Sequence, residues 1–181
     1  MAERTIVVFK PDSVKRGLVG EILSRFERVG LRIVGSKTVK VTEGFIAQHY
    51  PDKEEFLRGM GLKALENYVQ HKLDPIKEIG TADPVKIGKR IRRWNMDFLS
   101  RGPVIAVVLE GNHAVNNVRK LVGKTIPALA EPGTIRGDYS DDSSILANRE
   151  NRSVHNLIHA SGTVEEAEEE IKLWFKKNEL V

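Results

Sequence analysis

Residues 156–161 read Asn-Leu-Ile-His-Ala-Ser. Leu157 and Ile158 predict a short buried strand, and His159 stands where that strand leaves the core. A helix is expected to open shortly afterwards, at Thr163. A histidine at a strand end is held rigidly, and at neutral pH it keeps a free ring nitrogen that can act as a nucleophile. A lone histidine beside apolar residues is more often structural. The hypothesis therefore depends on further phosphate-binding residues elsewhere in the chain.

Around this stretch the hydrophobic period predicts the remaining elements. Residues 5–9 and 104–109 are continuous apolar runs, typical of buried strands, and residues 31–41 alternate as a strand covered on one face does. Apolar residues recur at helical spacing over 19–29, after Thr42, over 114–122 and over 164–175, which predicts four helices. Val29 is predicted to lie on the buried face of the first of these helices and Val164 on that of the last. Thr163 and Glu166 predict a capping box at the start of the last helix. This order predicts an α+β fold, a ferredoxin-like βαββαβ sandwich with an antiparallel sheet and helices on one face.

Three segments do not fit this core pattern. Residues 51–94 are charged and interrupted by glycine and proline, so we expect two or three short surface helices there, and residues 59–65 resemble a helix-hairpin-helix turn. Residues 124–139 are rich in proline and glycine, which predicts a long irregular loop, and such loops are usually functional. Residues 139–151 predict a further surface loop. The chain is therefore predicted to be a single domain, 1–181, with surface insertions at about 57–94 and 139–155.

Composition narrows the classes of function. The chain has 181 residues, 40% of them hydrophobic and 30% charged, and a net charge of +4, which favours anionic ligands but is weak for a dedicated DNA-binding protein. It has no cysteine, which excludes disulfides and a thiolate nucleophile and fits a cytoplasmic location. The start of the chain has no apolar signal segment, and the longest apolar run, residues 104–109, is too short to cross a bilayer. We expect no membrane association.

The polar residues at the ends of the predicted strands and in the long loop suit phosphoryl transfer. That reaction needs a nucleophile, fixed cations around the equatorial phosphate oxygens, and neutral donors. His159 is the candidate nucleophile. Arginine pairs with two phosphate oxygens at once and keeps its charge, so arginines are favoured among the cations. The candidate cations are Lys10, Arg119 and Arg136, and the candidate neutral donors are Thr125 and Asn156.

Three motifs together resemble the nucleoside diphosphate kinase family. They are Lys10-Pro-Asp12 followed by Arg16-Gly-Leu-Val-Gly20, then Pro132-Gly-Thr-Ile-Arg-Gly-Asp138, and Asn156-x-x-His159-x-Ser161. The match covers residues 4–50, 102–138 and 156–181, and the inserted segment marks a long form. The resemblance implies a ping-pong reaction, in which His159 takes the γ-phosphate of a nucleoside triphosphate and passes it to a nucleoside diphosphate.

The resemblance also implies roles in the catalytic centre. Lys10 would contact the γ-phosphate and the ribose hydroxyl, and Tyr50 would bond to Lys10 and steady the transferred group. Ser161 and Glu170 would support the nucleophile, with Glu170 fixing the second ring nitrogen of His159.

Further positions would hold the nucleotide itself. Arg119 and Thr125 would bind the β-phosphate, Arg136 the γ-phosphate side, and Asn156 the ribose. Mg²⁺ would be carried by the nucleotide phosphates without direct protein ligands, with Asp52 reaching it through water. The base would stack at the surface, which leaves its preference open, and Phe56 is the nearest candidate for that contact.

The chain departs from the family pattern at the nucleophile, where Ala160 and Gly162 stand in place of the usual glycine and aspartate. Neither position supplies a phosphate contact, so we expect activity. The loop over residues 124–139 matches one that packs between subunits, which favours a hexamer among homo-oligomers. A nucleic-acid-binding or regulatory nucleotide-binding module on the same fold is the alternative, although the strand over 104–109 lacks the aromatic residues that RNA-recognition domains stack on bases.

Overall fold

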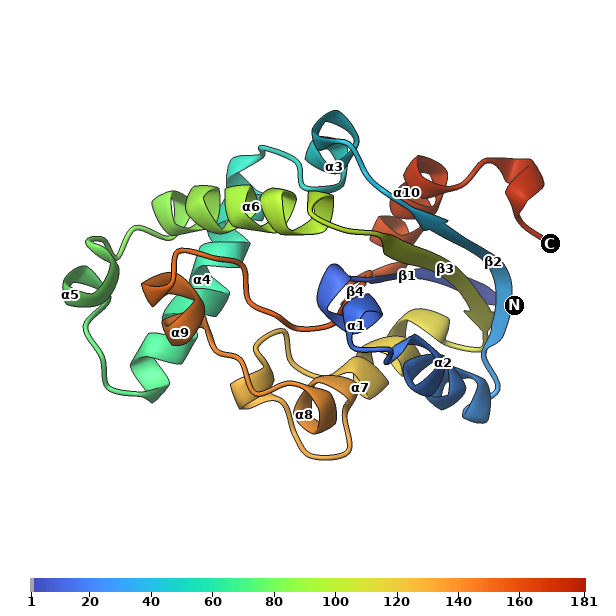
Figure 1. Cartoon of the computed structure of the whole chain (residues 1–181), viewed down its shortest axis with the longest axis horizontal. Coiled ribbons are helices and arrows are strands. Elements are labelled where there is room, and N and C mark those ends of the chain that lie inside the picture. Colours follow the sequence, from blue (N-terminus) through green and yellow to red (C-terminus); the bar gives the residue numbers. More distant parts are fainter. Residues whose placement is uncertain (1) are drawn as a thin grey trace.

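The structure, a computed structural model, describes residues 2–181. Its centre is a four-stranded antiparallel sheet in the order β2-β3-β1-β4, which confirms the predicted α+β class (Figure 1). The strands are β1 (Glu3–Phe9), β2 (Arg32–Val39), β3 (Val104–Gly111) and β4 (Ile158–Ala160). Because β1 pairs with β3 on one side and with the edge strand β4 on the other, segments from near the two ends of the sequence lie side by side.

Helices cover both faces of the sheet, so the expectation of helices on one face was wrong. Ile6 and Val8 of β1 belong to one buried cluster, while Val7 and Phe9 belong to a second cluster on the other face. A strand buried on both faces needs a continuous apolar run, which is what residues 5–9 provide. The second cluster is covered by α2 (Val19–Arg28) and α7 (Ala114–Val122).

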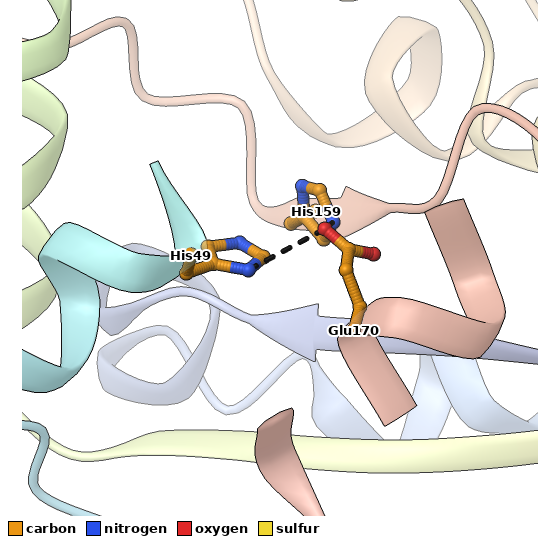
Figure 2. A group of neighbouring side chains, drawn as sticks. All are labelled: His49, His159 and Glu170. Carbon is orange, nitrogen blue, oxygen red and sulfur yellow. Dashed lines mark ion pairs between the residues drawn. The ribbon is translucent and has the colours of Figure 1, made fainter. Parts of the chain in front are cut away.

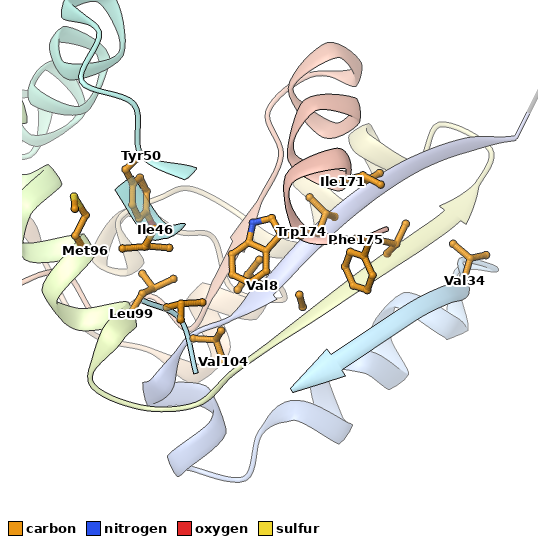
Figure 3. Close-up of a cluster of buried hydrophobic side chains, with 14 residues drawn as sticks. Val8, Val34, Ile46, Tyr50, Met96, Leu99, Val104, Ile171, Trp174 and Phe175 are labelled. Atoms are coloured by element: carbon orange, nitrogen blue, oxygen red, sulfur yellow. The ribbon is translucent and has the colours of Figure 1, made fainter. Parts of the chain in front are cut away.

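The first cluster lies under three other helices. They are α3 (Glu43–His49), α10 (Val164–Trp174) and the end of α6 (Pro84–Ser100). Figure 3 shows this cluster, in which Trp174, Phe175 and Leu99 pack over Val8. The cluster fixes α3 and α10 relative to β1, and these are the elements that carry the residues around His159.

The predicted helices at residues 19–29, 114–122 and 164–175 are confirmed, with corrections at their ends. Val29 and Val164 are 49% and 39% exposed, so neither belongs to a buried face. Thr163 Oγ1 accepts a hydrogen bond from the Glu166 N–H at 3.2 Å, as a capping residue should, but Glu166 Oε2 accepts from Gly162 N–H. The full capping box was therefore wrong, because the carboxylate reaches one residue further back.

The segment after residue 51 is also different from the prediction. Helices α4 (Glu54–Gln70) and α6 each have 17 residues and pack closely together, joined by the short α5 (Pro75–Ile79). A Cβ on Gly61 would lie 1.9 Å from the carbonyl oxygen of Pro84, and one on Gly88 would lie 1.9 Å from that of Leu57. These glycines permit close contact between the helices, and residues 59–65 are continuous helix. The predictions of short surface helices and of a helix-hairpin-helix turn were wrong.

Short helices also occupy the segments that were expected to be irregular. They are the 3-10 turn η1 (Pro127–Leu129), α8 (Ile135–Tyr139) and α9 (Ser144–Arg149), while α1 (Pro11–Lys15) and the 3-10 turn η2 (Lys177–Glu179) lie outside those segments. Side chains cap two of them: Thr134 Oγ1 accepts from Gly137 N–H and Ser143 Oγ accepts from Leu146 N–H. Across residues 2–181, the helices are too short or too polar to span a bilayer.

Candidate active site

His159 lies in the middle of β4, opposite Val8 of β1. The predicted strand was one residue too early, because Leu157 has a φ of 70° and cannot continue a strand. Its N–H donates to Asp12 Oδ2 at 3.0 Å, and its carbonyl oxygen accepts from Lys10 N–H at 2.9 Å. These two bonds hold the left-handed residue in place, so the chain enters β4 in one fixed direction and delivers His159 to the sheet edge.

Glu170 of α10 lies beside the imidazole. Its Oε1 is 2.8 Å from His159 Nε2, and its Oε2 accepts a hydrogen bond from Ser161 Oγ at 2.7 Å. Burial alone would raise the pKa of Glu170, but the contacts to His159, His49 and Ser161 outweigh it and lower the pKa to about 2. The carboxylate is therefore ionised at neutral pH, which favours a proton on Nε2 and leaves Nδ1 as the ring nitrogen with a free lone pair.

A second histidine completes this group, and the sequence did not point to it. His49 of α3 is buried, and its ring meets the His159 ring edge-on with centroids 4.4 Å apart. Its Nδ1 lies 3.4 Å from Glu170 Oε1 and accepts a hydrogen bond from Trp174 Nε1 at 3.3 Å. Burial and the neighbouring His159 lower the pKa of His49 to about 3, so this ring is neutral. Figure 2 shows how His49, His159 and Glu170 lie together.

Lys10 follows β1 and is buried next to the strand that carries His159. Its Nζ donates to Asn156 Oδ1 at 2.7 Å, and Asn156 Nδ2 donates to the carbonyl oxygen of Thr125 at 2.8 Å. Burial lowers the pKa of Lys10 to about 8, with Asp12 opposing and Arg136 adding to the effect. At neutral pH the ammonium is still charged, and its remaining N–H groups are available to a ligand.

Arg136 of α8 is almost completely buried, and it connects α8 to the segment around β4 and to the end of α7. Its guanidinium donates to the carbonyl oxygens of Asn156 at 3.2 Å, Ile158 at 2.6 Å and Gly123 at 3.1 Å. Burial and the charge of Arg119 lower its pKa from the ordinary value. Arg119 and Arg136 line the same cavity, and two cations that share a cavity favour an anion.

The predicted residues converge on one cavity. Its wall at the sheet is formed by side chains from the end of β1, from α3, α7, α8 and α10, and from the residues around β4. They are Lys10, His49, Tyr50, Arg119, Thr125, Arg136, Asn156, His159, Ala160 and Glu170. The other wall comes from the two long helices and α9, and includes Phe56, Met60, Lys63, Ile91, Asn95 and Asn148. Predicted positions from opposite ends of the chain thus face a single space.

Three predicted site residues, Asp52, Ser161 and Tyr50, do not make the contacts that their predicted roles would lead us to expect, or do not line the cavity. Asp52 is exposed and is not among the residues that line the cavity, and Ser161 lies behind Glu170. Tyr50 lines the cavity, and burial and Glu170 raise its pKa, but within residues 2–181 no hydrogen bond joins its hydroxyl to Lys10. The roles of Asp52 and Tyr50 stay predictions.

Glu166, for which the sequence predicted a part in the helix cap, also lies at the cavity. Its carboxylate lines the cavity and accepts from Gly162 N–H at 2.7 Å. A Cβ on Gly162 would lie 2.7 Å from that same oxygen, so glycine at 162 makes room for the carboxylate. An acidic group thus stands beside the position where the family pattern has an aspartate.

The carboxylates of the cavity do not form a cage for a metal ion. The one cluster of three histidine or acidic ligands in the described part of the chain is His49, His159 and Glu170, and Glu170 already contacts both His159 and Ser161. Mg²⁺ prefers oxygen ligands and keeps several waters. The donor set therefore fits a divalent ion that arrives on the phosphates of a ligand.

Comparison with known proteins identifies the family. The family model described as nucleoside diphosphate kinase matches residues 3–58 and 86–180. A nucleoside diphosphate kinase of Pyrobaculum aerophilum is 51% identical over 179 residues, which covers 99% of this chain and 98% of the relative.

The chain belongs to the nucleoside diphosphate kinase family.

Solved structures agree with this assignment. The crystal structure of the Pyrobaculum aerophilum kinase has a TM-score of 0.92 at 49% identity and covers all of both chains. A second solved structure is a transition-state mimic of the nucleoside diphosphate kinase of Borrelia burgdorferi with bound vanadate and ADP. It matches this chain with a TM-score of 0.78 at 36% identity, and the match covers 99% of this chain and 90% of that one. This chain is therefore a kinase of nucleotides, and enzymes of its family act on nucleoside diphosphates and triphosphates with a divalent metal.

The family model leaves residues 59–85 unmatched, which is most of α4, all of α5 and the start of α6. Several of these residues line the cavity, including Met60, Lys63 and Ala64. The unmatched segment is thus next to the active site and not remote from it.

Proposed function

We propose that His159 carries the phosphoryl group in a ping-pong transfer from a nucleoside triphosphate to a nucleoside diphosphate. The observation that carries this proposal is the 2.8 Å contact between His159 Nε2 and Glu170 Oε1. It assigns the proton to Nε2 and leaves the Nδ1 lone pair for the cavity that Lys10, Arg119 and Arg136 line.

In the first half-reaction, the Nδ1 lone pair attacks the γ-phosphorus. The Nδ1–P bond forms as the bond from phosphorus to the β,γ-bridging oxygen breaks, and the electron pair leaves with the nucleoside diphosphate. The imidazole becomes cationic, and the ionised Glu170 next to Nε2–H stabilises that charge. In the second half-reaction, a β-phosphate oxygen of another nucleoside diphosphate attacks the same phosphorus and restores neutral His159.

The cations stabilise the charge that spreads over the equatorial oxygens during both steps. Lys10 and Arg136 act near the transferred group, and Arg119 and Thr125 hold the β-phosphate. Asn156 binds the ribose while its amide positions the Lys10 ammonium. A Mg²⁺ ion carried by the nucleotide would neutralise part of the phosphate charge, and Asp52 would reach it through water.

Three further proposals come from the sequence. The chain works as a homo-oligomer, with a hexamer favoured, through the segment at residues 124–139. It is a single domain, 1–181, with insertions at about 57–94 and 139–155. It acts in the cytoplasm and does not bind nucleic acid.

Labelling with γ-³²P-ATP tests the central proposal. The wild-type protein should take up an acid-labile, alkali-stable label, and unlabelled GDP should remove it as labelled GTP. The His159→Ala variant should take up none, while keeping its folded circular-dichroism spectrum, because the Nδ1 lone pair of His49, the other imidazole at the cavity, is occupied by the Trp174 N–H. Undiminished labelling of His159→Ala would show that another residue is the nucleophile.

A regulatory nucleotide-binding module would bind ATP in the same experiment but exchange no phosphate. A nucleic-acid-binding module would instead bind oligonucleotides with a steep dependence on salt.

A further inference from the structure

Helix α4 brings a cation to the cavity that neither the family model nor the three motifs include. Lys63 lies within residues 59–85 and lines the cavity together with Arg119, Arg136 and His159. Its side chain is solvent-exposed, so it is free to move toward a ligand. The same cavity therefore has cations on both walls.

The charges around Lys63 are unbalanced. Partial desolvation lowers its pKa first, Arg119 and Arg136 lower it further, and Glu166 and Glu66 oppose them. Among residues 2–181, no carboxylate forms an ion pair with Lys63, whereas Arg58 on the same helix pairs with Glu54. A lysine turned toward two arginines is unfavourable unless an anion lies between them.

The backbone of Lys63 is held by helix packing even though its side chain is exposed. Gly61, two residues earlier, lies against the Pro84 carbonyl, and the next residue, Ala64, is buried. Helix α4 cannot rotate about its axis without breaking this contact with α6. Lys63 is therefore directed at the cavity by the packing of the two helices and not by a flexible loop.

We propose that Lys63 contacts the phosphates of the bound nucleotide from the α4 wall, which makes the segment unmatched by the family model part of the nucleotide site. The nature of the ligand rests on the proposed function, since a nucleotide polyphosphate is the anion that Arg119, Arg136 and His159 would share. Lys63 closes the ring of positive charge on the side that the sheet leaves open, and it supplies binding without taking part in the bonds that form and break.

Calorimetric titration with ADP and with inorganic tripolyphosphate tests this proposal. Lys63→Met should bind both about tenfold more weakly than wild type, and Lys63→Arg should restore most of the affinity, because the loss is that of one charge-assisted contact. In steady-state transfer, the KM for ATP should rise about tenfold while kcat changes little. Lys89→Met, at an exposed position of α6 outside the cavity, is the matched control and should behave as wild type.

Equal affinity of Lys63→Met and Lys89→Met for tripolyphosphate would overturn the contact. The two proposals can fail separately, because tripolyphosphate binding requires no phosphohistidine. If wild-type His159 took up no label but Lys63→Met still weakened tripolyphosphate binding, the proposed nucleophile would be wrong and the Lys63 site would stand.

Discussion

At the scale of single residues, Arg136 serves the fold as well as the site. Replacing it with alanine removes one donor from each of the carbonyl oxygens of Asn156, Ile158 and Gly123, so we expect the free energy of unfolding to fall by about 3 kcal/mol. Arg119 is only half-buried, and Arg119→Ala should change stability by less than about 0.5 kcal/mol while still impairing transfer. Urea denaturation measures both. Equal stability of the two variants would mean that Arg136 acts on the ligand alone.

Residue types in three motifs were enough to predict most of the site. His159 and Lys10 come from these motifs and Glu170 from the helix after them, and all three line one cavity because β1, β4 and α10 pack together. His49 and Glu166 were missed for a physical reason. Each is on a helix whose apolar pattern tells which face is buried, but not which distant polar group that face will meet.

At the scale of elements, the two long helices depend on residues that have no side chain. A methyl group on Gly61 would lie 1.9 Å from the backbone of Pro84, so Gly61→Ala must push α4 away from α6, and we expect a loss of about 3 kcal/mol. Gly59 has nothing within 4 Å of such a methyl group, so Gly59→Ala should stabilise the helix by about 0.5–1 kcal/mol. Thermal unfolding of the pair checks this. A similar melting temperature for both variants would rule out the close contact.

The same glycines explain which elements the sequence predicted. Strands and helices with a regular apolar period, such as β1 and α7, were found because the period alone determines them. Glycine and proline were interpreted as breaks in residues 51–94 and 124–139. In the structure, Gly61 and Gly88 are contact points inside helices, and α8 follows directly on a capping threonine, Thr134. Local chemistry cannot distinguish a break from a contact, since the partner lies elsewhere in the chain.

At the scale of the whole molecule, two buried groups beside the nucleophile, Glu170 and His49, make the stability of the fold sensitive to acid. The pKa of Glu170 is lowered from 4.5 to about 2, so the stability it contributes is present above 4.5 and is lost as the pH falls toward 2. The pKa of His49 is lowered from 6.5 to about 3, so its neutral form contributes stability above 6.5 that is lost as the pH falls toward 3. Both effects have the same sign.

Unfolding free energies between pH 7 and pH 3.5 should therefore decrease steadily in the wild-type protein. His49→Phe should flatten the upper part of this curve, because the buried ring no longer gains a proton on unfolding. Glu170→Gln should flatten the part below 4.5. If the curves of both variants run parallel to that of wild type, other groups dominate the acid sensitivity.

One hydrogen bond in the core, from Trp174 to His49, makes the fluorescence of Trp174 sensitive to the state of the nucleophile. Trp174 Nε1 donates to His49, and the His49 ring in turn lies against His159. A phosphate on His159 would place negative charge within two rings of the indole, and the emission of an indole responds to charge in its surroundings. The chain has two tryptophans, so Trp94→Phe would leave Trp174 as a single fluorophore that reports each half-turnover in real time.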